Sequence, residues 1–153
     1  MPGDDGTQLN PTPNEDAMAV EITGSYAGNL KTELRHTHSG ALLMTAAPRD
    51  NMGDGSSFSP TDLLAASLGS CMVTTMAIVA QREGIPFASA EFVAVKHMRA
   101  DPRRVDAIPV LIRMPAGLTA EQRARLERAA HECPVHRSLL PEIKKELEFE
   151  YSD

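Results

Sequence analysis

The sequence predicts an α+β fold built around one buried helix. Three features indicate it: strand-like runs near both ends, a long stretch without charged side chains, and a short amphipathic helix before the last strand. A chain of 153 residues can bury one core but hardly two. We therefore expect a single domain over residues 20–153. Residues 1–19 hold four acids and no Lys or Arg, which is typical of a disordered acidic tail.

Composition and charge exclude several classes of function. The formal net charge is −6, whereas proteins that bind nucleic acid rely on an excess of Lys and Arg. The acidic start of the chain lacks the positive charge and the apolar stretch of a secretory signal, so we expect a cytosolic protein. Structural disulfides are rare in the cytosol. The two cysteines are therefore core thiols, metal ligands or redox groups.

Residues 21–46 predict two or three antiparallel strands. Thr, Tyr, Leu and Val residues recur there, and Gly28 and a Ser39-Gly40 turn separate the strand-like runs. The loop that follows, residues 50–57, is rich in Gly, Ser and Asp. It lacks the Lys and the strand–helix context of a phosphate-binding loop, so we interpret it as a flexible lid or connector.

The clearest element is a long helix that begins after Ser59. Ser59 is a favourable N-cap, Pro60 suits the first helical position, and Gly84 stands where the helix should end. No side chain from Leu63 to Gln81 is charged, but several Ser and Thr residues make this stretch too polar for a membrane span. We expect the helix to be buried on all sides. Because so small a chain has little surface with which to wrap it, we also expect a second subunit.

The remainder of the chain predicts two strands, a helix, a short helical turn and a closing strand. In chain order these elements cover residues 87–98, 105–114, 119–132, 134–140 and 147–151. Thr119 and Gln122 form a capping box at the start of the helix. Asp101-Pro102 marks the turn between the two strands.

Cys71 lies in the middle of the long helix, among apolar and hydroxyl side chains. The simplest interpretation is a buried thiol that packs as a small apolar group. Reactivity would require a nearby cation, because the middle of a helix gains nothing from the helix dipole. Arg35 is the first candidate for that cation, with Arg49 and Lys31 behind it.

Cys133 stands between two predicted helices, directly before Pro134. As the N-cap of the second helix, its thiolate would accept backbone N–H bonds and lie at the positive end of the helix dipole. His131, His136 and Arg137 are close enough in sequence to add positive charge. These features predict that Cys133 is the more acidic of the two thiols. The alternative is a cysteine that merely ends a helix.

Both cysteines lie in motifs that resemble those of a known family. The run from Phe58 to Met72, FSPTDLLAASLGSCM, resembles the cysteine-bearing central helix of OsmC/Ohr proteins. The run from Cys133 to Leu139, CPVHRSL, resembles their second cysteine motif, and residues 26–30 fit their N-terminal strands. The resemblance extends over nearly the whole chain from residue 21 onward, in the expected order.

The resemblance implies an intertwined α+β homodimer, in which antiparallel sheets wrap two central helices and the sites lie at the subunit interface. It also implies a peroxidatic thiol at Cys71 and a resolving thiol at Cys133. The expected activity is thiol-dependent reduction of organic hydroperoxides, with Arg35 supporting Cys71 and a dithiol restoring the enzyme. The apolar helix surface around Cys71 favours an apolar hydroperoxide. We expect no cofactor and no metal.

One position departs from the family pattern. Members with strong organic-hydroperoxide activity carry a Glu directly after the Pro of the helix start, where it holds an Arg against the reactive sulfur. This chain has Thr61 there, and the acid follows at Asp62. The chain is therefore more similar to the branch with a Ser-Pro-Thr-Asp start. Consecutive residues on a helix are about 100° apart, so the Asp62 side chain extends in a different direction from that of a Glu at position 61. Asp62 completes the predicted catalytic set.

Three other functions are compatible with the same residues. A carrier that holds a small apolar or sulfur-containing ligand without turnover is the main alternative, because of Thr61. Imidazole and thiolate groups also suit zinc; the candidate ligands are His36, His38, His131, Cys133 and His136. Acyl transfer would use either cysteine with His136 as its base, but no third, orienting residue stands out.

Overall fold

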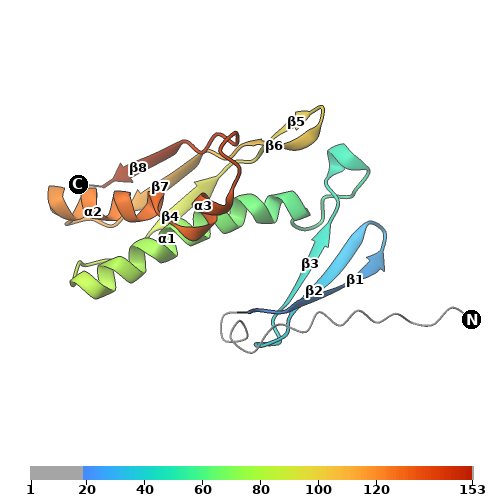
Figure 1. The fold of residues 1–153 in the computed structure, drawn as a ribbon, viewed down its shortest axis with the longest axis horizontal. Coiled ribbons are helices and arrows are strands. Elements are labelled where there is room, and N and C mark those ends of the chain that lie inside the picture. Colours follow the sequence, from blue (N-terminus) through green and yellow to red (C-terminus); the bar gives the residue numbers. More distant parts are fainter. Residues whose placement is uncertain (1–18, 153) are drawn as a thin grey trace, which may run out of the picture. The chain divides into compact units, whose positions relative to one another are not determined.

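The structure, a computed structural model, describes residues 19–152 (Figure 1). The acidic tail predicted for residues 1–19 therefore lies, except for its last residue, outside the described part of the chain. The chain divides after Ser57 into two compact units. The single domain over residues 20–153 stays a prediction.

The first unit is a three-stranded antiparallel sheet. Its strands are β1 (Ile22–Gly28), β2 (Lys31–His36) and β3 (Leu42–Ala46), in the order β1-β2-β3. The tight β1–β2 turn places Gly28 at a φ of 84°, in the left-handed region that glycine adopts without strain. The sequence prediction of two or three antiparallel strands is confirmed.

The loop after β3 is more ordered than the sequence predicted. It contains a short 3-10 helix, Arg49–Asn51, and the Gly53 backbone N–H donates to Pro48 O at 2.9 Å. Asp54 accepts a hydrogen bond from the Ser56 backbone at 2.9 Å and pairs with Lys31 at 3.0 Å. Hydrogen bonds from Ser56, followed by that from Lys31, lower the pKa of Asp54 to about 2. These contacts fix the connector.

Helix α1 (Pro60–Glu83) begins and ends where the sequence predicts. The Ser59 side chain accepts the Asp62 backbone N–H, and the Asp62 carboxylate accepts the Ser59 backbone N–H. This reciprocal pair is a capping box. Gly84 closes the other end at a φ of 67°, which an L-residue with a side chain adopts only under strain.

The second unit contains α1 and two small sheets. β4 (Glu91–Ala94), β7 (Val110–Met114) and β8 (Leu147–Tyr151) form one sheet in the order β4-β7-β8. β5 (His97–Ala100) and β6 (Arg103–Ala107) form a hairpin. The two predicted strands at 87–98 and 105–114 are thus each divided, by short interruptions near Val95 and Ile108. Helices α2 (Ala120–His131) and α3 (Pro134–Ser138) precede β8.

One strand pairing differs from the expected antiparallel arrangement. β8 runs parallel to β7, with Ile112 opposite Phe149, whereas the other paired strands of this unit run antiparallel. The chain passes through α2 and α3 between β7 and β8, and such a helical crossover returns a strand in the same direction. The α+β class is confirmed, with one mixed sheet.

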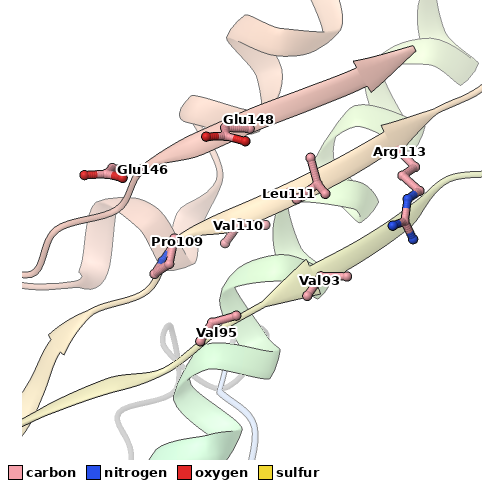
Figure 2. A pocket seen from close by; sticks show the side chains of 8 residues that line it. All are labelled: Val93, Val95, Pro109, Val110, Leu111, Arg113, Glu146 and Glu148. Carbon is pink, nitrogen blue, oxygen red and sulfur yellow. The ribbon is translucent and has the colours of Figure 1, made fainter. Parts of the chain in front are cut away.

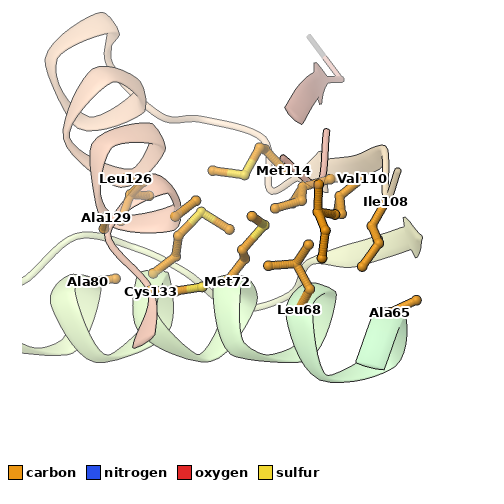
Figure 3. Close-up of a cluster of buried hydrophobic side chains, with 14 of the residues drawn as sticks. Ala65, Leu68, Met72, Ala80, Ile108, Val110, Met114, Leu126, Ala129 and Cys133 are labelled. Carbon is orange, nitrogen blue, oxygen red and sulfur yellow. The ribbon is translucent and has the colours of Figure 1, made fainter. Parts of the chain in front are cut away.

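The core lies between α1, α2 and one face of the β4-β7-β8 sheet (Figure 3). Its fully buried side chains include Leu68 and Met72 from α1, Ile112 from β7, Leu126 from α2, and Cys133. No Trp is present and none of these residues is aromatic, so aliphatic and Met side chains fill the space. Helix α1 is long and apolar enough to cross a membrane by length and composition, and one of its faces packs in this core.

The sequence predicts that α1 is buried on all sides, but within one chain one of its faces is exposed. Its buried residues, which include Ala65, Leu68, Met72 and Met76, recur three or four positions apart and face the core. The opposite face is weakly polar and partly exposed; Ile78, for example, is 44% exposed. A second subunit is what we expect to cover this face.

Candidate functional site

The two thiols, distant in the sequence, meet in the second unit. Cys71 projects from the middle of α1 and packs against the core that contains Cys133. The Cys71 side chain contributes to raising the pKa of the Cys133 thiol, so the two thiols lie near each other. Both cysteines are free, so no disulfide joins them. Their juxtaposition follows from the packing of α3 against α1, which no local sequence signal encodes.

Cys133 is the N-cap of α3, as the sequence predicts. Its Sγ accepts the His136 backbone N–H at 3.3 Å. The sequence predicts that this cap position makes the Cys133 thiol acidic, and that expectation is wrong. Cys133 is fully buried, and burial raises the pKa of its thiol, outweighing the opposing hydrogen bond from His136. At neutral pH Cys133 is a thiol.

The histidines near Cys133 supply less charge than the sequence suggested. Burial, followed by the nearby charges of Lys145 and His131, lowers the pKa of His136. His136 is therefore mostly neutral at pH 7, and the positive charge expected from it is absent. The imidazole rings of His131 and His136 meet edge to face, with centroids 6.2 Å apart. Among residues 19–152, no group of three or more His, Cys, Asp or Glu side chains is placed to hold a metal ion.

Asp62 lies at the start of α1, roughly 13 Å along the helix axis from Cys71 at about 1.5 Å per residue. Both of its carboxylate oxygens are engaged: Oδ2 accepts the Ser59 backbone N–H at 2.8 Å, and Oδ1 accepts Lys96 Nζ at 2.6 Å. Burial disfavours the carboxylate, but the hydrogen bonds from Lys96 and Ser59 outweigh it and lower the pKa of Asp62. Its predicted catalytic role stays a prediction.

Sequence reasoning missed Lys96, which lies in the link between β4 and β5 and binds the start of α1. Its Nζ donates to Asp62 Oδ1, to Thr61 Oγ1 at 2.9 Å and to Ser59 Oγ at 3.3 Å. Only 15% of the Lys96 side chain is exposed. Thr61, at the position of the family Glu, is thus bound to a cation of its own chain. The contact spans more than 30 positions of sequence, and no motif marks it.

We expect Lys96→Met to lower the free energy of unfolding by about 1 kcal/mol, because it breaks a half-buried ion pair and leaves Asp62 without its cation. Chemical denaturation at pH 7 measures the loss. Arg113→Met is the matched control. Arg113 also pairs with a carboxylate, Glu150, at 2.8 Å, but 52% of its side chain is exposed, so we expect a smaller loss.

The pH dependence of Lys96→Met provides a second measurement. The folded-state pKa of Asp62 is lowered, so this pair stabilises the fold above the unfolded pKa of about 4 and loses its effect as the pH falls. The stability difference between wild type and Lys96→Met should therefore shrink below about pH 4. A difference that is constant between pH 7 and pH 3 would contradict the assignment.

The candidate cations for Cys71 lie in the first unit. Arg35 is an exposed residue of β2, opposite Thr23 of β1 and Leu42 of β3. Within residues 19–152 it has no ion-pair partner. The two reserve candidates are engaged elsewhere, because Arg49 Nε donates to Asp54 O at 3.2 Å and Lys31 pairs with the Asp54 carboxylate. Arg35 is therefore the better placed of the three to act on another group, and that role stays a prediction.

The surface of the second unit has several hollows, two of which adjoin β4. A shallow groove of about 340 Å³ lies on the sheet face turned away from α1 (Figure 2). Its apolar floor includes Val93 and Leu111, and Glu148 lines the β8 side. A larger hollow, of about 590 Å³, lies between α1 and β4. Neither is lined by Cys71 or Cys133.

The fold and the site define a class: a small α+β protein with two free thiols, one on the long helix α1 and one in the core against which that helix packs. The model of the OsmC-like protein family matches residues 53–148. The chain therefore belongs to the OsmC-like family. Comparison with curated proteins found no match.

Solved structures agree with this assignment. A Psychrobacter arcticus protein, described as a candidate osmotic stress induced and detoxification response protein, is 37% identical with a TM-score of 0.81, covering 84% of this chain and 94% of that one. OsmC from Legionella pneumophila, an organic hydroperoxide resistance protein, is 20% identical with a TM-score of 0.71, covering 86% and 96%. An organic hydroperoxide resistance protein from Elizabethkingia anophelis is 16% identical with a TM-score of 0.71, covering 88% and 96%. The last two show a shared fold.

Proposed function

We propose that this protein reduces organic hydroperoxides by thiol chemistry, with Cys71 as the peroxidatic and Cys133 as the resolving residue. The observation that carries the proposal is the proximity of the two thiols, because Cys71 packs against the core that contains Cys133 and its side chain influences the pKa of the Cys133 thiol. A sulfenic acid formed at either sulfur would already lie within reach of the other thiol. The names of two structural neighbours, organic hydroperoxide resistance proteins, support the same activity.

Access decides which sulfur attacks the substrate. Cys133 is fully buried, whereas Cys71 is half-buried. The Cys71 thiolate attacks the outer oxygen of the hydroperoxide, the O–O bond breaks, and the alcohol leaves after taking a proton. Cys71 is then a sulfenic acid. The Cys133 thiol attacks this sulfur, water leaves, and a Cys71–Cys133 disulfide forms. A dithiol returns two electrons and two protons and becomes a disulfide itself.

The remaining parts of the proposal concern the surroundings of the thiols. Arg35 is the cation that would stabilise the Cys71 thiolate, and Asp62 would hold the helix start in place. We propose a homodimer whose second subunit covers the exposed face of α1, and a place in the Ser-Pro-Thr-Asp branch of the family. The reducing cytosol would supply the dithiol, and the cellular role would be a response to oxidative stress.

The deciding experiment adds one equivalent of cumene hydroperoxide to the reduced protein and maps the disulfides by peptide mass spectrometry. We expect a Cys71–Cys133 disulfide within seconds in the wild type and none in Cys71→Ser. Hydrogen peroxide at the same concentration should react more slowly. Two thiols that stay free in the wild type would overturn the proposal and favour the carrier function instead.

Alkylation provides a test of the assigned order that needs no peroxide. With iodoacetamide at pH 8, we expect Cys71 to react about tenfold faster than Cys133 or more, because Cys133 is buried and its pKa is raised. Mass spectrometry of the time course measures both rates. In Cys71→Ser, Cys133 should stay unlabelled until the protein is unfolded with urea. Faster labelling of Cys133 would reverse the roles.

A further inference from the structure

The outer groove, on the sheet face turned away from α1, has an apolar floor beside a row of acids (Figure 2). Side chains of a strand alternate between the two faces of its sheet. Ala94, Ile112 and Phe149 pack toward the core, so their neighbours along each strand face outward. The apolar residues that line the groove include Val93, Val95, Pro109 and Leu111. The outward acids at and before β8 are Glu146, Glu148 and Glu150.

One cross-strand row of this face is neutralised by the chain itself. Arg113 of β7 lies opposite Glu91 of β4 and Glu150 of β8. Its guanidinium pairs with both carboxylates, with nitrogen–oxygen distances of 3.6 Å to Glu91 and 2.8 Å to Glu150. A single basic side chain on the middle strand therefore serves the acids of both outer strands.

The neighbouring rows lack such a cation. Leu111 lies opposite Glu148, so an apolar side chain stands where the first row has Arg113. Pro109 and Glu146, each one residue before the paired strands begin, line the same groove. Within residues 19–152, no ion pair engages Glu146 or Glu148. Their like charges repel each other along one side of the sheet, and a cation from outside the chain would relieve this repulsion.

The expected dimer should leave this face uncovered. Its sheets wrap two central helices, and the groove lies on the side of the sheet away from α1. A strand of a second subunit that extended the sheet would hydrogen-bond in the plane of the sheet, beside the groove rather than over it. Val93 and Val95, each 46% exposed, would then stay open to a partner. Because Cys71 lies on α1, a partner bound here is independent of the proposed peroxidase activity.

We propose that the outer groove is a docking surface for an extended segment of a partner protein with Lys or Arg at alternate positions. Side chains two residues apart on an extended chain are about 6.6 Å apart, and the same spacing separates Glu146 from Glu148 along their own strand. Each basic side chain packs its methylene groups on the apolar floor and places its charge at an acid. The segment thus completes two rows in the way that Arg113 completes the first.

The test compares two acetylated and amidated peptides, each labelled with the same neutral dye, by fluorescence polarisation with the reduced full-length protein at low ionic strength. The sequence Val-Lys-Val-Lys-Val places its lysines at alternate positions, and Val-Val-Lys-Lys-Val places them side by side. We expect saturable binding of the alternating peptide, about fivefold tighter than that of the other, because only it can engage both acids at once. Glu148→Gln should weaken the alternating peptide about fivefold, and added salt should weaken it further in the wild type.

Glu142→Gln is the matched control. It changes the net charge by the same amount, and Glu142 is exposed in the same unit but lies outside the groove. Its peptide affinity should stay within about 1.5-fold of the wild type. Circular dichroism establishes that each variant is folded.

Three results would overturn the proposal: no saturable binding, equal affinity for the two peptides, or equal losses in Glu148→Gln and Glu142→Gln. A fall in the oligomeric mass of Glu148→Gln, measured by analytical ultracentrifugation, would also overturn it, because a second copy of the chain would then be the occupant of the groove.

Discussion

Turnover of cumene hydroperoxide should fall below detection in Cys71→Ser, a loss of about a thousandfold or more. The hydroxyl of Ser is a far weaker nucleophile than a thiolate at neutral pH, and the buried Cys133 thiol cannot replace it because it is inaccessible and protonated. A coupled assay with dithiothreitol as reductant measures the rate. Circular dichroism should show an unchanged fold, since Ser is close to Cys in size.

Cys133→Ser separates the two chemical steps and is the natural control. Its first reaction with peroxide should proceed at nearly the wild-type rate, because Cys71 is intact. Without a resolving thiol, the Cys71 sulfenic acid should persist and react with dimedone, and excess peroxide should oxidise it to the sulfinic acid. If instead Cys133→Ser loses the first reaction while Cys71→Ser keeps it, the assigned roles are reversed.

Leu68→Ala should produce the largest loss of stability, about 3 kcal/mol of unfolding free energy. Leu68 is completely buried in the middle of α1, among core side chains that include Ile108 and Val110 (Figure 3). Removing its branched end leaves a cavity that the rigid α1–sheet packing cannot fill. Urea denaturation monitored by circular dichroism measures the change.

Leu140→Ala is the matched control for that experiment. It removes the same atoms, but Leu140 is 59% exposed, so we expect a loss of less than about 1 kcal/mol. Equal losses for the two variants would mean that Leu68 is not part of the folding core. Because the expected dimer adds a concentration-dependent term to stability, both variants should be measured at several protein concentrations.

Local signals in the sequence predicted the elements near them. The limits of α1 followed from Ser59, Pro60 and Gly84, and the start of α2 followed from the Thr119–Gln122 capping box, because caps act over three or four residues. Alternating Glu and apolar residues predicted β8 in the same way. Its parallel pairing with β7 was not predicted, since the partner of a strand is set by the crossover that returns it.

The candidate site was predicted less completely, because its properties depend on contacts between distant residues. The two motifs identified Cys71 and Cys133, but only the packing of α3 on α1 shows that their thiols meet. The acidity expected for Cys133 was deduced from its cap position and neighbouring His136. Burial, which no local pattern reveals, reverses it. Lys96 was missed for the same reason.

The proximity of the two thiols implies that oxidation would increase the stability of the protein. A covalent link between Cys71 and Cys133 would close a loop of roughly 60 residues, and restricting the unfolded chain in this way adds about 4 kcal/mol to the stability of a domain. Because both sulfurs are already neighbours, little native distortion should offset this gain. The oxidised protein should therefore be more stable than the reduced protein. Its melting temperature should rise on exposure to peroxide and fall back when the reductant is restored.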